Sequence, residues 1–156
     1  MVTGAGRGIG RAIARQLADD GARVAATDVD GAAARETAEL LGGDAVGLAC
    51  DVTDRASVDA AVAEVAERLG PVDVLVNNAG WDTAGPFVAS DPAVWDRIIA
   101  INLLGTLNTC HAVLPGMVER GSGAVVNLGS DAGRVGSSGE AVYCAAKGGV
   151  VAFTKA

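Results

Sequence analysis

Short apolar runs rich in Val and Ala alternate along this chain with longer segments in which apolar residues recur every three or four positions. The short runs, which we interpret as strands, are Met1–Val2, 23–28, 45–50, 72–77 and 124–129. The longer segments, which we interpret as helices, are 9–20, 32–41, 54–69, 91–120 and 141–156. This alternation predicts βαβ units and a parallel sheet covered by helices on both faces. The expected fold class is α/β, a doubly wound parallel sheet in a single domain over 1–156.

Two of the helical segments carry specific expectations. Ile9, Ile13 and Leu17 recur at i, i+4 and i+8, so they share one face of the first helix. Asp91–Pro92 is a favourable N-cap and first-turn pair for the segment 91–120. Pro115 lies inside that segment, and we expect it to end or kink the helix.

Glycines and polar residues gather where predicted strands end. Gly4–Gly10, Asp28, Asp51, Asn77–Gly80 and Ser130 each end or follow a strand. The carboxyl ends of parallel strands meet at one edge of the sheet, and ligands of such sheets bind there. We therefore expect these residues to form one binding site.

The stretch "TGAGRGIG" (3–10) follows the first strand and opens the first helix. Its glycines, Gly4, Gly8 and Gly10, permit a tight turn and a close approach of the backbone to a ligand. The free N–H groups at the start of the helix, around Ile9, would then face a pyrophosphate. By itself such a turn is weak evidence, because glycines also make ordinary strand–helix connections.

Asp28 ends the second strand, where an acid can hold the ribose hydroxyls of NAD. A 2′-phosphate would be repelled there, by about 4 kcal/mol at about 4 Å and an effective dielectric of about 20. Arg7 acts in the opposite sense, because it could attract that phosphate. We favour NAD over NADP, since Asp28 should lie closer to the 2′ position. The alternative is that Asp28 only makes a turn.

Tyr143 and Lys147 in "AVYCAAKGG" are four residues apart and share one face of the last helix. A neighbouring cation favours the phenolate, but ionising a tyrosine near pH 7 takes roughly 4 kcal/mol, more than Lys147 alone would supply. The spacing by itself also fits two residues on a solvated helix face.

Bulk composition narrows the classes of function. The net charge is −7 and the isoelectric point is about 4.5, which argues against nucleic acid or a membrane surface as a partner. No uninterrupted apolar run reaches the ~20 residues of a membrane span. The three cysteines are scattered, which favours free thiols in the cytoplasm and no metal site.

The glycine turn, "NNAG" at 77–80 and Y-x-x-x-K together resemble the short-chain dehydrogenase/reductase family, and the resemblance covers the whole chain. It implies a Rossmann-like fold and an NAD(P)-dependent oxidoreductase that interconverts a secondary alcohol and a ketone. It also implies that Tyr143 is the general acid/base, that Lys147 lowers its pKa and binds the nicotinamide ribose, and that Ser130 holds the substrate oxygen. With oxidised nicotinamide nearby, the two positive charges could supply the missing pKa shift.

The same resemblance assigns the remaining residues of the site. Asn102 in "INLLG" matches an asparagine that completes a proton relay through water, although it could instead be a helix-kink residue. Asp51–Val52 matches a pair that contacts adenine. Asn78, with Ala79 and Gly80, matches the position beside the cofactor ribose, whereas Asn77 is expected to brace the sheet.

The stretches "NNAGWD", "HAVLPGMVERG" and "SDAGRVGSSGEAVY" resemble a branch of the family that oxidises 2-hydroxycyclohexane-1-carbonyl-CoA. That branch implies a small-molecule substrate, a β-hydroxyacyl-CoA thioester, with Trp81 either walling the pocket or packing ordinarily. The same motifs would serve a 3-oxoacyl-acyl-carrier-protein reductase, which usually prefers NADP. A third possibility is a cofactor-binding protein without turnover.

Relative to the family pattern, the chain stops inside the helix of Tyr143 and Lys147. We expect a partial domain that lacks the last strands and the substrate-covering segment, with little activity by itself. The helices over 91–120 and 141–156 match those that pair subunits in the family, so the resemblance implies a homodimer or homotetramer for the intact protein.

Overall fold

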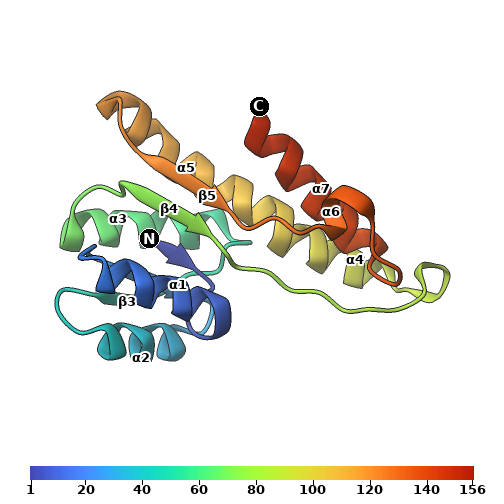
Figure 1. Cartoon of the computed structure of the whole chain (residues 1–156), viewed down its shortest axis with the longest axis horizontal. Coiled ribbons are helices and arrows are strands. Elements are labelled where there is room, and N and C mark those ends of the chain that lie inside the picture. The colour runs from blue at the N-terminus through green and yellow to red at the C-terminus, as the bar shows by residue number, and fades with distance from the viewer.

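The computed structural model describes residues 1–156 and contains one five-stranded parallel sheet (Figure 1). The strands are β1 (Val2–Thr3), β2 (Ala25–Asp28), β3 (Val46–Ala49), β4 (Val74–Asn77) and β5 (Ala124–Asn127). Their order across the sheet is β3-β2-β1-β4-β5. The direction of winding reverses between β1 and β4, and ligands of such sheets bind in the crevice at that reversal. The predicted α/β doubly wound fold is confirmed.

Four helices cover the sheet in two layers. Helices α1 (Gly8–Asp19) and α2 (Gly31–Leu41) lie on one face, and α3 (Arg55–Leu69) and α5 (Gly105–Arg120) lie on the other (Figure 1). The smaller core lies under α1 and includes Val2, Ala14 and Val76. The larger core lies under α3 and α5 and is built around Leu75 and Val58.

The remaining helices form a separate arm beside the sheet. They are η1 (Phe87–Ala89), α4 (Pro92–Ile99), the π-helical segment η2 (Ala100–Leu104), α6 (Ala132–Val135) and α7 (Ala141–Lys155). Helix α7 packs against α4, η2 and α6. In Figure 1 this arm extends away from α1 and α2, beyond the carboxyl ends of β4 and β5.

The prediction that Pro115 ends the helix is wrong. Helix α5 runs through Pro115 to Arg120, and the departure from α-helical geometry is at η2 instead. A proline removes one N–H donor and so leaves the carbonyl four residues earlier, at His111, without its helical partner. Both residues are exposed, so water can satisfy that carbonyl.

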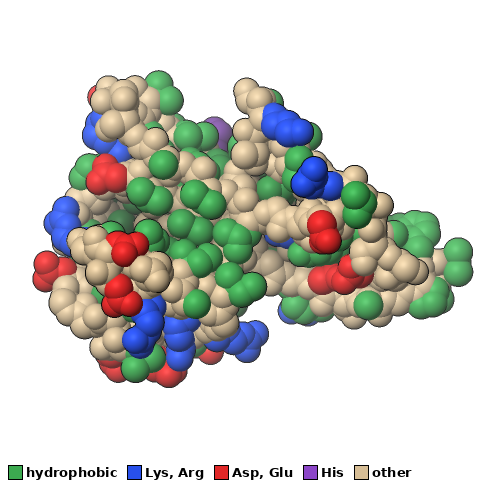
Figure 2. Space-filling view, viewed as in Figure 1, with side chains coloured by type: hydrophobic (Ala, Val, Ile, Leu, Met, Phe, Trp, Pro, Cys, Tyr) green, Lys and Arg blue, Asp and Glu red, His purple; other side chains and the backbone are tan.

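Two expectations about burial also fail in part. Ile9 is 69% exposed, so the buried face of α1 is formed by Gly10 and Ala14, while Ile13 and Leu17 are only partly buried. Helices do not cover both faces of β5, where Val126 is 50% exposed on the α1 side. Apolar side chains lie open on the face seen in Figure 2.

The continuous helical stretch Pro92–Arg120 is long and apolar enough, by length and composition, to cross a membrane. Here Cys110, Val113 and Met117 of this stretch are buried in the larger core, against the sheet. It is therefore a core helix of this fold.

Candidate active site

The glycine turn between β1 and α1 is shaped for a phosphate. Gly4 and Gly8 adopt φ values of +61° and +56°, which other residues rarely adopt. A Cβ on Gly10 would collide with the Gly4 carbonyl oxygen, so only glycine fits there. The start of α1 has no side-chain cap, whereas Asp side chains cap α2, α3 and α4. The first N–H groups of α1 are therefore free to bind an anion.

Asp28 is held in place by the backbone around it. Its Oδ2 accepts from the Gly6 N–H at 2.9 Å, and its Oδ1 accepts from the Asp30 N–H at 3.0 Å. These two bonds orient the carboxylate at the end of β2, and each oxygen keeps a lone pair for a further donor. Asp51, at the end of β3, similarly accepts from Thr53, through Oδ1 alone.

One cavity of about 650 Å³ joins these features. Ten of the predicted cofactor-binding residues line it: Gly4, Arg7, Ile9, Gly10, Asp28, Asp51, Val52, Asn78, Ala79 and Gly80. Of the other three, Gly8 lies in the turn, and Tyr143 and Lys147 lie on α7. The cavity's free N–H groups and its acids fit a dinucleotide cofactor.

Two neighbouring asparagines brace the carboxyl end of β4. Asn77 is buried; its amide donates to Asn127 at 2.8 Å and its oxygen accepts from Thr109 at 2.6 Å. This confirms its expected role in the sheet. Asn78 donates to the carbonyls of Thr3 and Gly4, so it fixes the glycine turn while also lining the cavity.

Tyr143, Lys147 and Ser130 converge where β5 meets α7. The Lys147 ammonium lies 5.7 Å from the centre of the Tyr143 ring and donates to the Leu128 carbonyl at 2.7 Å. Lys147 is only 6% exposed, so the solvated-face alternative does not apply to it. The Ser130 hydroxyl accepts from the Ala132 N–H at 3.2 Å, and Asp131, the N-cap of α6, accepts from the same N–H at 2.9 Å.

The environment favours protonated Tyr143 in the chain by itself. Burial raises the pKa of Tyr143, hydrogen bonding with Ser130 opposes that rise, and the carboxylates of Asp82 and Glu140 add to it. Burial also lowers the pKa of Lys147. These effects act against the lowered tyrosine pKa that the resemblance implies.

Asn102 is completely buried inside η2. Its amide donates to the carbonyls of Trp81 (2.6 Å) and Ile98 (2.9 Å), and not to Tyr143 or Lys147. The side chain thus ties the segment after β4 to the π-helical turn. If Asn102 takes part in a proton relay, its backbone carbonyl is the group that would do so. That carbonyl accepts a hydrogen bond from the Thr106 hydroxyl.

The sequence did not predict a role for Arg97 or for the pair Asp82 and Glu140. The guanidinium of Arg97 stacks over the Trp81 ring at 4.1 Å, and both line the large cavity, so Trp81 is a wall residue of that cavity.

A second cavity, of about 220 Å³, is lined by residues that include Asp82, Glu140 and Tyr143. Asp82 ends the stretch "NNAGWD" but was given no role from the sequence, and only the fold brings it near Tyr143.

The thiols and the acids form no metal site. The chain holds no group of three or more His, Cys, Asp or Glu side chains placed to share a metal ion. Cys50, Cys110 and Cys144 are all free, as their spacing predicted.

Comparison with known proteins gives one consistent result. The family described as short chain dehydrogenase matches residues 1–156. The chain is 44% identical to a sorbitol dehydrogenase of Cereibacter sphaeroides and 46% identical to a D-threitol dehydrogenase of Mycolicibacterium smegmatis, over 99% of this chain and 61% of each relative. It is 39% identical to a 3-oxoacyl-(acyl-carrier-protein) reductase of Vibrio cholerae, over 99% of this chain and 64% of that protein. The chain thus spans about three fifths of the length of these relatives.

Proposed function

The chain belongs to the short-chain dehydrogenase family, and we propose that the protein interconverts a secondary alcohol and a ketone with NAD. The observation that carries this proposal is the convergence of Tyr143, Ser130 and Lys147 at the carboxyl edge of the sheet that also bears the glycine turn and Asp28. When bound, the nicotinamide ring supplies the hydride acceptor for oxidation or the hydride donor for reduction.

Tyr143 moves the proton. In reduction, its phenol donates a proton to the substrate oxygen as that oxygen becomes a hydroxyl; in oxidation, the phenolate accepts the hydroxyl proton. Because the chain by itself favours the phenol, Tyr143 is ready for the reductive direction. The oxidative direction needs added positive charge, and Lys147 contributes part of it from beside the ring.

Ser130 and Lys147 position the reacting groups. Ser130 lowers the pKa of Tyr143 and would hold the substrate oxygen beside the phenol. Lys147 donates to Leu128 with one of its three N–H groups and keeps two for the nicotinamide ribose. Asn102 would act mainly by fixing the segment after β4.

The preference for NAD over NADP rests on Asp28. Its carboxylate is fixed by two backbone N–H groups and faces the cavity, where it would accept from the ribose hydroxyls. A 2′-phosphate at the same position would meet that negative charge without a compensating donor from Asp28.

Two thioester substrates follow from the sequence. The first is a β-hydroxyacyl-CoA, and the second is a 3-oxoacyl group on acyl-carrier protein, which one of the relatives is named for. A reductase of 3-oxoacyl groups on acyl-carrier protein would be expected to use NADP. Because Asp28 favours NAD, it favours the β-hydroxyacyl-CoA substrate. A chain that binds the cofactor without turnover is the remaining alternative.

We propose that the protein is a homodimer or homotetramer in the cytoplasm. The support for the oligomer is an apolar surface on the long helix, where Leu104, Leu114 and Val118 are 47%, 36% and 76% exposed. Light scattering after size-exclusion chromatography tests this, with Val118→Glu expected to shift the protein toward the monomer.

The proposed function is tested by titrating the chain with NADH and NADPH and following nicotinamide fluorescence. We expect binding of both with a clear preference for NADH. In a form of the protein shown to be active, Tyr143→Phe should bind NADH like the wild type but lose about 10²–10⁴-fold in the rate of hydride transfer. A folded chain, by circular dichroism, that binds neither nucleotide would overturn the proposal, as would full turnover by Tyr143→Phe.

A further inference from the structure

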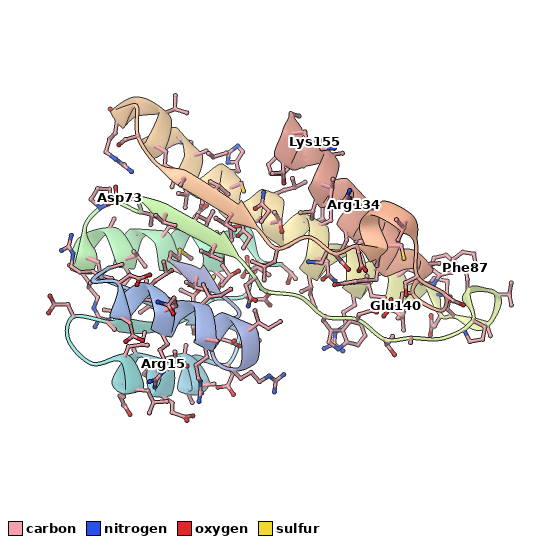
Figure 3. All side chains as sticks on the ribbon, in the orientation of Figure 1. Arg15, Asp73, Phe87, Arg134, Glu140 and Lys155 are labelled. Carbon is pink, nitrogen blue, oxygen red and sulfur yellow. The ribbon has the colours of Figure 1, made fainter.

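Two carboxylates border the cavity that Tyr143 opens into. Asp82 lies in the segment after β4, and Glu140 lies at the start of α7, three residues before Tyr143. A hydrogen bond from the Gly85 N–H to the Gly139 carbonyl, at 2.8 Å, holds these two segments together. Figure 3 shows Glu140 and Phe87 at the same end of the molecule, where the segment after β4 runs beside α7.

One oxygen atom of this acidic pair is left without a hydrogen-bond donor. Oδ1 of Asp82 is buried and has no hydrogen-bond partner, and it is the one buried side-chain polar atom of the chain in that state. Neither Asp82 nor Glu140 takes part in any of the four ion pairs. Burial raises the pKa of Asp82, hydrogen bonding with the Thr83 backbone opposes this, and both the charge of Glu140 and hydrogen bonding with its side chain raise it further. A buried acceptor without a donor is costly, so the site is suited to a ligand that donates.

The opposite wall of this cavity is apolar. Phe87 and Trp95 stack with their ring centres 5.1 Å apart, and Ile98 lies beside them. The indole N–H of Trp95 already donates to Ser90 at 2.7 Å, so it offers nothing to a ligand. A substrate held between this wall and Tyr143 therefore meets hydrogen-bond acceptors on one side and carbon on the other.

We propose that Asp82 and Glu140 are specificity-determining residues that accept hydrogen bonds from a hydroxyl next to the reacting carbinol, so that the substrate is a vicinal diol or polyol. This inference rests on the proposed function, because it assigns the substrate of the same site. A hydroxyl can donate to the pair. The thioester carbonyl of a β-hydroxyacyl substrate only accepts, and would place one acceptor against another. The acidic pair thus favours a polyol over the thioesters expected from sequence.

The test measures binding of D-threitol and of butan-2-ol to the NADH-bound chain by saturation-transfer NMR titration. The two ligands have four carbons each, and only the first carries adjacent hydroxyls. We compare the wild type with Asp82→Asn and Glu140→Gln, which keep the side-chain shape but remove the charge. Glu39→Gln is the matched control, because Glu39 is an exposed carboxylate on α2, outside both cavities.

We expect the wild type and Glu39→Gln to bind threitol at least about ten-fold more tightly than butan-2-ol, because losing a charge-assisted hydrogen bond weakens binding by about that factor. Asp82→Asn and Glu140→Gln should each reduce the ratio of threitol affinity to butan-2-ol affinity by about ten-fold. If Asp82→Asn fails to fold by circular dichroism, Glu140→Gln carries the test, since its side chain lies at the helix start.

Two results would overturn the assignment: a threitol to butan-2-ol ratio near one in the wild type, or a ratio unchanged in the folded variants. Both are read in a chain that binds NADH, so the proposed function would survive them. Absence of NADH binding would instead overturn the proposed function. The NADH titration measures that binding separately from the comparison of threitol with butan-2-ol.

Discussion

Replacing Gly133 with alanine should push α6 away from α7 and disturb the position of Ser130. A Cβ on Gly133 would lie 2.6 Å from the Gly148 nitrogen and 2.6 Å from the Lys147 carbonyl carbon. Ordinary contact begins at 3.4 Å, so α6 would have to move by about 0.8 Å. Both obstructing atoms belong to the backbone of α7, and therefore no flexible side chain can relieve the overlap.

The magnitude follows from two opposing terms. Overpacking of this kind costs typically about 1–3 kcal/mol, and the rigid backbone places Gly133→Ala near the upper end. Alanine in a helix recovers about 1 kcal/mol relative to glycine. We therefore expect the free energy of unfolding to fall by about 2 kcal/mol. Gly129→Ala is the matched control, because its Cβ would meet only Val151, at 3.8 Å.

The assay combines urea unfolding with titration of the phenol. Tyr143 is the only tyrosine in the chain, so the near-ultraviolet absorbance of phenolate reports its pKa directly. Because hydrogen bonding with Ser130 lowers the pKa of Tyr143, its loss in Gly133→Ala should move the titration to higher pH. Gly129→Ala should change neither measurement substantially. The reasoning fails if the two variants unfold at the same urea concentration and titrate alike.

Three further outcomes are expected. Asp28→Asn should raise the NADPH to NADH affinity ratio at least about ten-fold, because a repulsion of about 4 kcal/mol is removed; an unchanged ratio in fluorescence titration would exclude Asp28 as the selector. Asp82→Asn should lower the pKa of Tyr143 by removing a nearby negative charge, seen as a phenolate absorbance shift to lower pH, and a shift to higher pH would contradict the geometry. Only the partly exposed Cys144 should react with a thiol reagent at about pH 8 in the folded chain. Cys110 is buried, and the pKa of Cys50 is raised to about 11 by its burial and by the charge of Asp51. Rapid reaction of all three thiols would contradict the fold.

The sequence by itself determined the sheet, the glycine turn and ten of the residues that line the large cavity. These follow from local rules: apolar periodicity separates strands from helices, glycine is needed where φ is positive at Gly4 and Gly8, and polar residues after parallel strands meet at one edge. The spacing of Tyr143 and Lys147 likewise sets them on one helix face before any packing is known.

Only the tertiary structure decided how those residues are surrounded. The sequence named Asn102 as a relay residue without placing its side chain, and packing directs the amide to Trp81 and Ile98. Pro115 was expected to end or kink the helix, yet the helix continues to Arg120, and His111, whose carbonyl loses its partner, is exposed. Asp82 is 61 positions from Tyr143 (143 − 82) and belongs to no periodic segment, so its charge reaches the phenol only through the fold. Burial, and the pKa shifts that follow from it, depend on neighbours distant in sequence, which no local pattern encodes.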